Sequence, residues 1–209
     1  MKILLTGING QLGSQLQPLL IKVGEVTAVG RNNLDLADPN AISTLIDQVK
    51  PELIINAAAY TAGVYGAYGK GNFVKTMLRV GKDREELRVV YDQVGCPTWT
   101  GDLAEAIAQI IPHLNSETYG TYHYTNSGAI SWYDFAIAIF EEGRQLGFPL
   151  QVKQVVPITT AEYPTPAKRP AFSVLNSGKI SKVLGTYCPY WRYSLKQMLK
   201  QLAALRSIY

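Results

Sequence analysis

Short continuous hydrophobic runs alternate with amphipathic stretches through the first third of the chain. The runs over 2–6, 25–30 and 53–59 predict strands of a parallel sheet, the third one buried on both faces. The stretches between them, 11–23 and 40–49, carry apolar residues at helical spacing and predict helices. This βαβαβ order is typical of one half of a doubly wound α/β sheet.

The pattern becomes less regular after residue 62. Residues 63–71 are rich in glycine and tyrosine, and 163–170 hold three prolines, so both segments predict loops. The other predicted elements are helices over 72–81, 102–111, 132–146 and 193–205, and strands over 87–91, 121–125 and 151–157. Asp38, Asn72, Thr100 and Ser131 are the expected helix caps.

We therefore predict an α/β fold with two parts. Residues 1–62 are expected to form a partial NAD(P)-binding domain, a Rossmann-like doubly wound parallel sheet truncated after its third strand. Residues 63–209 are expected to complete that fold and to add a smaller α+β substrate-binding lobe.

The turn between the first strand and the first helix carries glycines at positions 7, 10 and 13. Gly7 permits the turn, Gly10 lets the backbone approach a phosphate, and Gly13 allows the helix to pack closely on the strand. Because the spacing occurs between a strand and a helix of a βαβ unit, it predicts a dinucleotide whose pyrophosphate meets the turn and helix N-terminus.

The residue after the second predicted strand favours one cofactor over the other. Arg31 follows that strand where an acidic residue would bind a ribose 2′-hydroxyl, and its guanidinium suits a 2′-phosphate. This favours NADP (NADPH) over NAD. Asp35, about 20 residues beyond the glycines, leaves NAD open, and Arg31 is alternatively a simple surface cation.

Composition narrows the class of protein. The 209 residues are 47% hydrophobic, enough for one good core, and no apolar run approaches the ~20 residues of a membrane span. The apolar start at 3–5 is too short for a signal-peptide core. Cys96 and Cys188 form no disulfide framework or metal-ligand pair. We expect a cytoplasmic protein without a membrane partner or metal.

Charge is distributed unevenly along the chain. All 16 acidic residues lie at or before Glu162, whereas eight of the 20 basic residues follow it. These cations are spread singly, without a run or an aromatic ladder, which argues against nucleic-acid binding. The basic C-terminal region is then either a solvated face or part of a pocket for a phosphorylated substrate.

Several segments together resemble the dTDP-4-dehydrorhamnose reductases, a family of extended short-chain dehydrogenases. The segments are Thr6–Gly13, Leu34–Leu36, Asn56–Thr61, Asn72–Leu78, Asp92–Thr98, Trp132–Asp134 and Tyr163–Pro170. The resemblance implies NADPH-dependent reduction of a dTDP-linked 4-keto sugar, dTDP-4-dehydro-L-rhamnose, to dTDP-L-rhamnose for cell-surface polysaccharide.

The resemblance also implies the site residues. Those expected at the cofactor are Gly7, Asn9, Gly10, Gln11, Leu12, Gly13, Arg31, Asp35, Leu36, Ala57, Ala58, Ala59 and Tyr60. Those expected at the nucleotide sugar are Gln93, Thr98 and Arg169. Hydrogen bonding within a turn is the alternative role for Gln93 and Thr98.

The chain departs from the family where Ala62 meets Gly63. The resemblance implies a catalytic Ser or Thr and a Tyr-x-x-x-Lys pair between these two residues. On the order of 80 residues are missing there, at about 30 per βαβ unit. None of the 13 tyrosines is followed by lysine four positions later, so no catalytic residue is assigned.

Three hypotheses follow from this departure. The chain is a reductase by descent with little or no activity, a non-catalytic binding or regulatory subunit that keeps the dinucleotide turn, or a deletion product without a stable fold. The loss would leave the edge of the 53–59 strand open to pairing. A homodimer, or dependence on another partner, would be ways of covering it.

Overall fold

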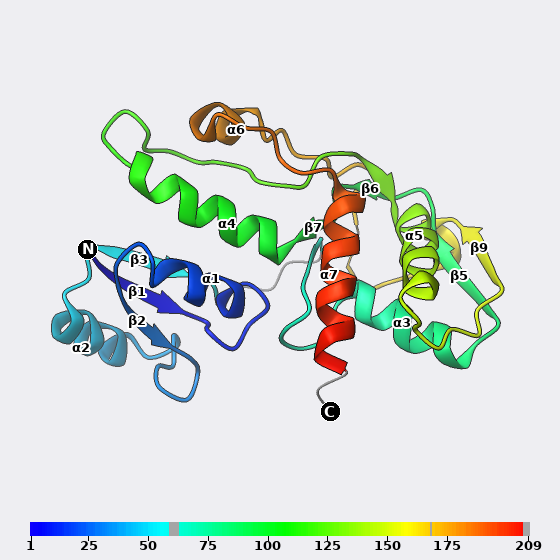
Figure 1. Cartoon of the computed structure of the whole chain (residues 1–209), viewed down its shortest axis with the longest axis horizontal. Coiled ribbons are helices and arrows are strands. Elements are labelled where there is room, and N and C mark those ends of the chain that lie inside the picture. The colour runs from blue at the N-terminus through cyan, green and yellow to red at the C-terminus, as the bar shows by residue number, and fades with distance from the viewer. Residues whose placement is uncertain (59–62, 168, 207–209) are drawn as a thin grey trace.

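The computed structural model describes residues 1–58, 63–167 and 169–206 (Figure 1). A three-stranded sheet near the N-terminus lies at one end of the molecule, and a region built from the later residues lies at the other. In the view of Figure 1, α4 (Thr100–Ile110) lies above the sheet, and α7 (Trp191–Arg206) lies between the two ends.

The N-terminal sheet is parallel, with the strand order β2-β1-β3. Its strands are β1 (Lys2–Thr6), β2 (Glu25–Val29) and β3 (Leu53–Asn56), connected by α1 (Gly13–Leu20) and α2 (Pro39–Val49). The predicted βαβαβ unit is confirmed. Because β2 and β3 lie on opposite sides of β1, the carboxyl ends of β1 and β3 flank a topological switch point, where open α/β sheets bind ligands.

Helices cover the two faces of this sheet differently. Helix α1 and α4 (Thr100–Ile110) share one face, and α2 packs on the other. The buried residues beneath α1 and α4 include Ile3, Leu5, Leu16, Leu20, Ala57 and Ala104. The buried residues beneath α2 are Leu4, Val29 and Leu34.

The remaining strands form three two-stranded sheets. Strands β4 (Val64–Tyr65) and β7 (Thr98–Trp99) pair in parallel, as do β5 (Glu86–Val90) and β9 (Gln154–Ile158). Strands β6 (Val94–Gly95) and β8 (Ile130–Ser131) pair antiparallel. Two 3-10 turns complete the irregular regions, at Ile111–His113 and Thr160–Glu162.

Helices α3 (Phe73–Asp83), α5 (Trp132–Gln145) and α7 (Trp191–Arg206) enclose the second large core. An aromatic group centred on Phe135 holds them together, with ring centroids 5.3 Å from Tyr65 and 5.9 Å from Trp191. No helix in the described part of the chain is long and apolar enough to cross a membrane.

Three of the four expected caps are confirmed. The Asp38 carboxylate accepts hydrogen bonds from the N–H groups of Asn40 and Ala41, and Asn72 caps α3 in the same way. Ser131 and Asp134 form a reciprocal capping box at the start of α5. Each cap satisfies N–H groups that lack a partner within the helix.

Thr100 is not a cap. Helix α4 begins at Thr100 itself, and the Thr100 hydroxyl is buried against Gly66 without a hydrogen-bond partner among the described residues. The prediction of a wholly irregular loop over 63–71 is also wrong at its start, because Val64 and Tyr65 pair with β7.

The predicted strand over 121–125 does not form. Its backbone contacts side chains instead of a neighbouring strand: the Thr125 N–H donates to the Ser177 hydroxyl, and Lys179 Nζ donates to the Thr121 carbonyl oxygen. Lys179 is the second residue of α6 (Gly178–Leu184), a short helix that the sequence pattern did not predict.

Strand β3 is shorter and more exposed than the continuous apolar run predicted. It ends at Asn56, whose side-chain oxygen accepts a hydrogen bond from the Ala58 N–H and draws the backbone out of the ladder. Leu53 and Ile55 pack beneath α1 and α4, but Ile54 points to the other face and is 49% exposed. The expectation of burial on both faces is therefore wrong.

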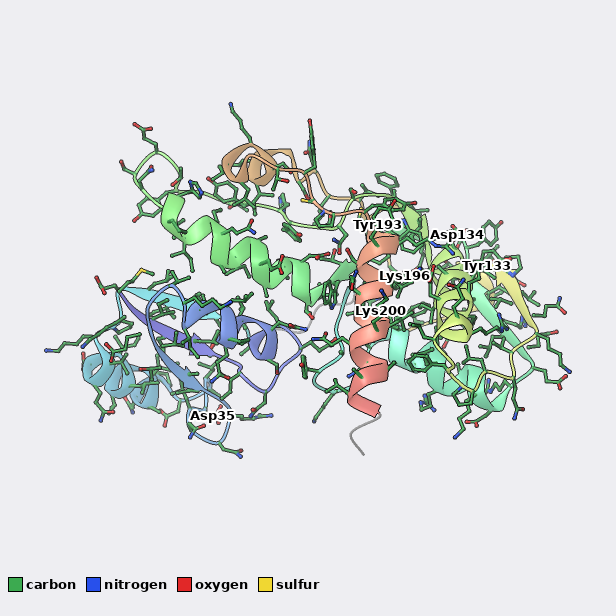
Figure 2. The ribbon with its side chains drawn as sticks, viewed as in Figure 1. Asp35, Tyr133, Asp134, Tyr193, Lys196 and Lys200 are labelled. Atoms are coloured by element: carbon green, nitrogen blue, oxygen red, sulfur yellow. The ribbon has the colours of Figure 1, made fainter. Side chains whose placement is uncertain are left out.

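Most basic residues of the C-terminal region lie at the surface rather than in one pocket. Arg192 Nη2 lies 2.5 Å from Glu141 Oε2, and Lys196 Nζ lies 3.7 Å from the buried Glu142 carboxylate. Figure 2 shows Lys196 and Lys200 on α7 in the middle of the molecule, away from Asp35, which lies beside the N-terminal sheet. Hydrogen bonding to Glu141 raises the pKa of Arg192. These ion pairs fix α7 against α5.

A buried polar network joins α4, α7 and the segment before β8. Asn126 is fully buried, and its amide nitrogen donates to Asp102 Oδ2 at 2.6 Å and to Ser194 Oγ at 3.1 Å. Its amide oxygen accepts the Trp99 N–H at 2.8 Å. A single side chain thus satisfies a buried carboxylate and a backbone donor.

We expect the substitution Asn126→Ala to lower the free energy of unfolding by about 3 kcal/mol, because it removes one of the two hydrogen bonds to the buried Asp102 carboxylate, leaving that from Ser194, and leaves the Trp99 N–H without a partner. Urea denaturation measures the loss. Asn32→Ala is the matched control, since Asn32 is exposed and donates no hydrogen bond to another described residue; it should change stability by less than about 0.5 kcal/mol. Equal effects in both variants would contradict the role of the network.

Candidate functional site

The turn after β1 has the close-packed geometry that the glycine spacing predicts. Gly7 adopts a left-handed φ of 75°, and a Cβ at this position would lie 2.6 Å from the Ala58 nitrogen. A Cβ on Gly13 would collide with the Gly7 carbonyl oxygen. The Gly10 N–H donates to that same oxygen at 3.0 Å. Only glycine permits this approach of α1 to the ends of β1 and β3.

Donor groups are available at the start of α1. The N–H groups of Gln11, Leu12 and Gly13 form no hydrogen bond with any other described residue. Unpaired N–H groups at a helix N-terminus, together with the helix dipole, favour an anion such as a pyrophosphate. The turn therefore fits the phosphates of a dinucleotide.

A cleft of about 500 Å³ opens beside this turn at the switch point of the sheet. Eight predicted cofactor residues line it: Gly7, Asn9, Gly10, Arg31, Asp35, Leu36, Ala57 and Ala58. Four further lining residues were not assigned to the cofactor individually: Thr6, Val29, Gly30 and Leu34, of which Thr6 and Leu34 belong to segments that carry the family resemblance. They lie at or just beyond the ends of β1 and β2, a position that strand boundaries alone could have indicated.

Five predicted cofactor residues are not among those that line the cleft. Leu12 packs against the core beneath α1, and Gly13 is buried where α1 meets the Gly7 carbonyl group. Gln11 faces the neighbouring cavity instead. Ala59 and Tyr60 lie outside the described residues.

The cleft carries one cation and one carboxylate near its mouth. Arg31 is exposed and forms no ion pair with a described acidic residue. Asp35 Oδ1 accepts the Ala37 N–H at 3.0 Å, which holds the carboxylate within its own turn. The Arg31 guanidinium is thus the group free to meet a further phosphate, such as that on a 2′-oxygen.

A second cavity, of about 490 Å³, begins at the next residue of the glycine turn. Gln11 lines it, together with the predicted substrate residues Gln93 and Arg169. Arg88, Trp132 and Tyr163 line it as well and were not assigned to the site from the sequence. The cavity therefore combines two guanidinium groups with three aromatic side chains, since Phe73 lines it too.

Thr98 does not line either cavity. Its side chain is buried in β7, where its hydroxyl donates to the Cys96 carbonyl oxygen and accepts the Asn126 N–H. Contact of Thr98 with the substrate stays a prediction; the hydrogen bonds that its hydroxyl makes in this structure are those of the alternative role, within a turn. Gln93 is also hydrogen-bonded, through Nε2 to the Thr160 hydroxyl, but remains at the cavity wall.

The loop before α3 ties the two cavities together. Asn72 Nδ2 donates to Gln11 Oε1 at 2.7 Å and to the Gly66 carbonyl oxygen at 2.9 Å. Gly69, at a φ of 69°, lies directly against Gln11. Lys75 Nζ donates to the carbonyl oxygens of residues 68 and 69, and partial burial lowers its pKa. The glycine turn is therefore held in place from the side of the second cavity.

Ionisable groups near the second cavity are held in place by hydrogen bonds. The N–H and hydroxyl of Thr160 donate to Asp92 and lower the pKa of its carboxyl group. The N–H and hydroxyl of Thr159 donate in the same way to Glu162 and lower the pKa of its carboxyl group. Both carboxylates fix the turn that precedes Tyr163. Among the described residues no group of His, Cys, Asp and Glu could hold a metal ion.

A larger cavity, of about 770 Å³, lies beside α6. None of the predicted site residues lines it, and none of its lining residues belongs to the glycine turn. Its size alone does not make it the functional site, because the residues suited to phosphates and nucleotides surround the other two cavities.

Comparison with known proteins identifies the family. The family model described as the RmlD substrate binding domain matches residues 1–63 and 61–204. A dTDP-4-dehydrorhamnose reductase structure from Clostridium acetobutylicum is 31% identical and superposes with a TM-score of 0.84 over 97% of this chain and 99% of that one. The Bacillus anthracis dTDP-4-dehydrorhamnose reductase, solved in complex with NADP, is 26% identical with a TM-score of 0.82, covering 96% and 99%.

The comparisons also locate the missing segment. The Escherichia coli K12 dTDP-4-dehydrorhamnose reductase is 29% identical over 299 aligned positions that span all of both proteins, against 209 residues here, which leaves 90 positions without a counterpart. The family match breaks at 61–63, where the sequence predicted a loss. With the family model matching both halves on either side of this break, the chain belongs to the dTDP-4-dehydrorhamnose reductase family.

Proposed function

We propose that this protein binds NADP in the cleft beside the glycine turn and a dTDP-linked sugar in the adjoining cavity. It would act on dTDP-4-dehydro-L-rhamnose as its family does, but with severely reduced turnover. One observation carries the proposal: Gly10 lines the first cavity and the next residue, Gln11, lines the second. A dinucleotide and a nucleotide sugar bound at these sites would therefore lie next to each other, on either side of this turn.

The cofactor assignment is supported by chemistry in the cleft. The unpaired N–H groups at the start of α1 suit a pyrophosphate, and Arg31 suits a 2′-phosphate. The Bacillus anthracis relative was solved with NADP. When bound, NADPH would supply the hydride, and this chain's residues would only bind and orient it.

The substrate assignment is supported by the lining of the second cavity. The guanidinium group of Arg169 suits the charge of a nucleoside diphosphate, and the ring of Trp132 offers a face for the base. Arg88 lines the same cavity, with Nη2 paired to Glu162 at 3.2 Å. Gln93 adds an amide that can hydrogen-bond to polar groups of the ligand. Of the residues first assigned, we retain Gln93 and Arg169.

A second candidate function is a non-catalytic subunit that binds the same two ligands. It is favoured by the sequence, because none of the 13 tyrosines is followed by lysine at the fourth position. Both candidates share the ligands and differ in turnover alone. For either, we propose residues 1–62 as the cofactor-binding part, residues 63–209 as the remainder with the substrate lobe, and a cytoplasmic location.

Isothermal titration of the purified protein with NADPH, and separately with dTDP, tests the proposal. We expect saturable one-site binding of each, and binding of dTDP in the presence of saturating NADPH, since the cavities are adjacent but distinct. A protein that is folded by circular dichroism but binds neither ligand would overturn both candidate functions.

Arg31 is expected to set the preference for NADPH. The substitution Arg31→Ala should weaken NADPH binding about 10-fold or more, through loss of a charge-assisted contact, and leave NADH binding almost unchanged. Titrations with both cofactors measure the ratio. Arg79→Ala is the matched control, because Arg79 is an exposed arginine on α3 outside both cavities. Equal losses for NADPH and NADH would instead identify Arg31 as a general surface cation.

A further inference from the structure

Strand β3 is an open edge of the N-terminal sheet. It pairs with β1 on one side, and no other described strand pairs with its second side. The next strand in the chain, β4, belongs to a different sheet with β7. The family match divides at 61–63, between these two strands. The edge is therefore exposed by the same departure that shortens the chain.

The exposed edge has no feature that discourages pairing. Its sequence, Leu-Ile-Ile-Asn over 53–56, contains no charge and no proline, the devices by which edge strands avoid other chains. Ile54 projects from the face of the sheet on which α2 packs. Helix α2 covers Leu4 and Val29 on that face but does not bury Ile54, which is 49% exposed. The opposite edge, β2, begins with the exposed charged residue Glu25 and is polar again at its centre.

We propose that a second copy of this chain covers the edge, with the two β3 strands pairing antiparallel about a two-fold axis. Such an axis, perpendicular to the sheet, maps each face onto itself, so a central residue opposes its own copy. Ile54 then lies across from the partner subunit's Ile54, and Leu53 across from the partner subunit's Ile55. Residues opposed in this way lie about 5 Å apart and pack together.

Self-pairing fits this strand better than a foreign partner for two reasons. First, Ile54 would oppose the partner subunit's Ile54, and Leu53 would oppose the partner subunit's Ile55, so each central side chain would meet an apolar one. A two-fold interface requires such a self-complementary surface. Glu52, the charged residue that immediately precedes the strand, would face the partner subunit's Asn56, so like charges are not opposed. The result is one continuous six-stranded sheet, in the order β2-β1-β3-β3-β1-β2.

Oligomeric state across a hundredfold range of protein concentration tests the interface. Sedimentation or light scattering should give a dimer for the wild type, and Ile54→Lys should raise the dimer dissociation constant about 10-fold or more by placing two cations opposite each other. Ile21→Lys is the matched control: Ile21 is 63% exposed, follows α1 and lies away from the edge. This variant should dimerise like the wild type.

Two results would overturn the proposal: a wild-type monomer at every concentration, or a dimer that Ile54→Lys leaves intact. If Ile54→Lys fails to fold, Ile54→Thr keeps the β-branched shape and should weaken the dimer while the thermal transition persists. Amide exchange over 53–56 should slow as the wild-type concentration rises and stay constant in the Ile54 variant. NADPH binding measured on the same samples separates this result from that of the proposed function.

Discussion

Reduction of the 4-keto sugar by this protein is expected to proceed about 10²–10⁴-fold more slowly than by the Escherichia coli relative, even with both ligands bound. Addition of hydride to a carbonyl carbon develops negative charge on oxygen. A positioned acid must deliver a proton there for the step to be fast. The family resemblance assigns that task to a Tyr-x-x-x-Lys pair, and the chain has no such pair.

The tyrosines near the site are poor substitutes. Tyr65 is buried without a hydrogen-bond partner among the described residues, and burial, with the Asp102 charge adding to it, raises its pKa well above the ordinary value. A raised pKa makes the phenol a weaker acid. Tyr163 lines the second cavity but is 58% exposed, so water competes for its hydroxyl. Lys75 is bound to two backbone carbonyl groups.

Loss of NADPH absorbance, followed with saturating cofactor and keto sugar, measures turnover. The Escherichia coli enzyme run in parallel is the positive control, and the same assay without sugar gives the background. Turnover within tenfold of the control would contradict the prediction and would require a proton donor in this chain. Tyr163→Phe would then test the one phenol at the cavity wall, since it removes the hydroxyl and keeps the ring.

Features set by local chemistry were predictable from the sequence. The glycine turn formed as expected because Gly10 and Gly13 meet the Gly7 carbonyl group within the same turn, and Gly7 meets Ala57 and Ala58 just beyond β3, the strand next to β1. The caps at Asp38, Asn72 and Ser131 formed because a side chain bonds an N–H two or three residues away. Such interactions depend little on the rest of the fold.

Features set by distant contacts were not predictable. Thr98 fits a ligand-binding turn by sequence, but Asn126 and β4 bury it in β7. The apolar run over 53–59 predicts burial on both faces, yet what covers Ile54 depends on elements that would follow residue 62. Arg88 and Trp132 join the substrate cavity only because β5 and α5 pack against α3.

The substitution Gly7→Ala is expected to weaken NADPH binding about 100-fold or more and to lower the free energy of unfolding by about 2–4 kcal/mol. Two effects combine at this position. A φ of 75° costs an alanine about 1 kcal/mol, and its Cβ would lie 2.6 Å from the Ala58 nitrogen and 2.7 Å from the Ala57 carbonyl carbon. Because these are backbone atoms, no side-chain rotation relieves the collision, and the turn must move away from β3.

Gly147→Ala separates the two effects, because Gly147 has the same φ of 75° and no atom within 4 Å of an added Cβ. It should cost the conformational strain alone, about 1 kcal/mol, and leave NADPH affinity unchanged. Calorimetric titration and urea denaturation of both variants give the comparison. Unchanged NADPH affinity in Gly7→Ala would mean that the cofactor does not bind at this turn, whereas equal stability losses would mean that Ala57 and Ala58 yield without cost. Because the two substitutions place alanine at the same φ, the difference between their losses of NADPH affinity and of stability measures the effect of the close approach of β1 and β3. We propose that the cofactor site depends on this approach.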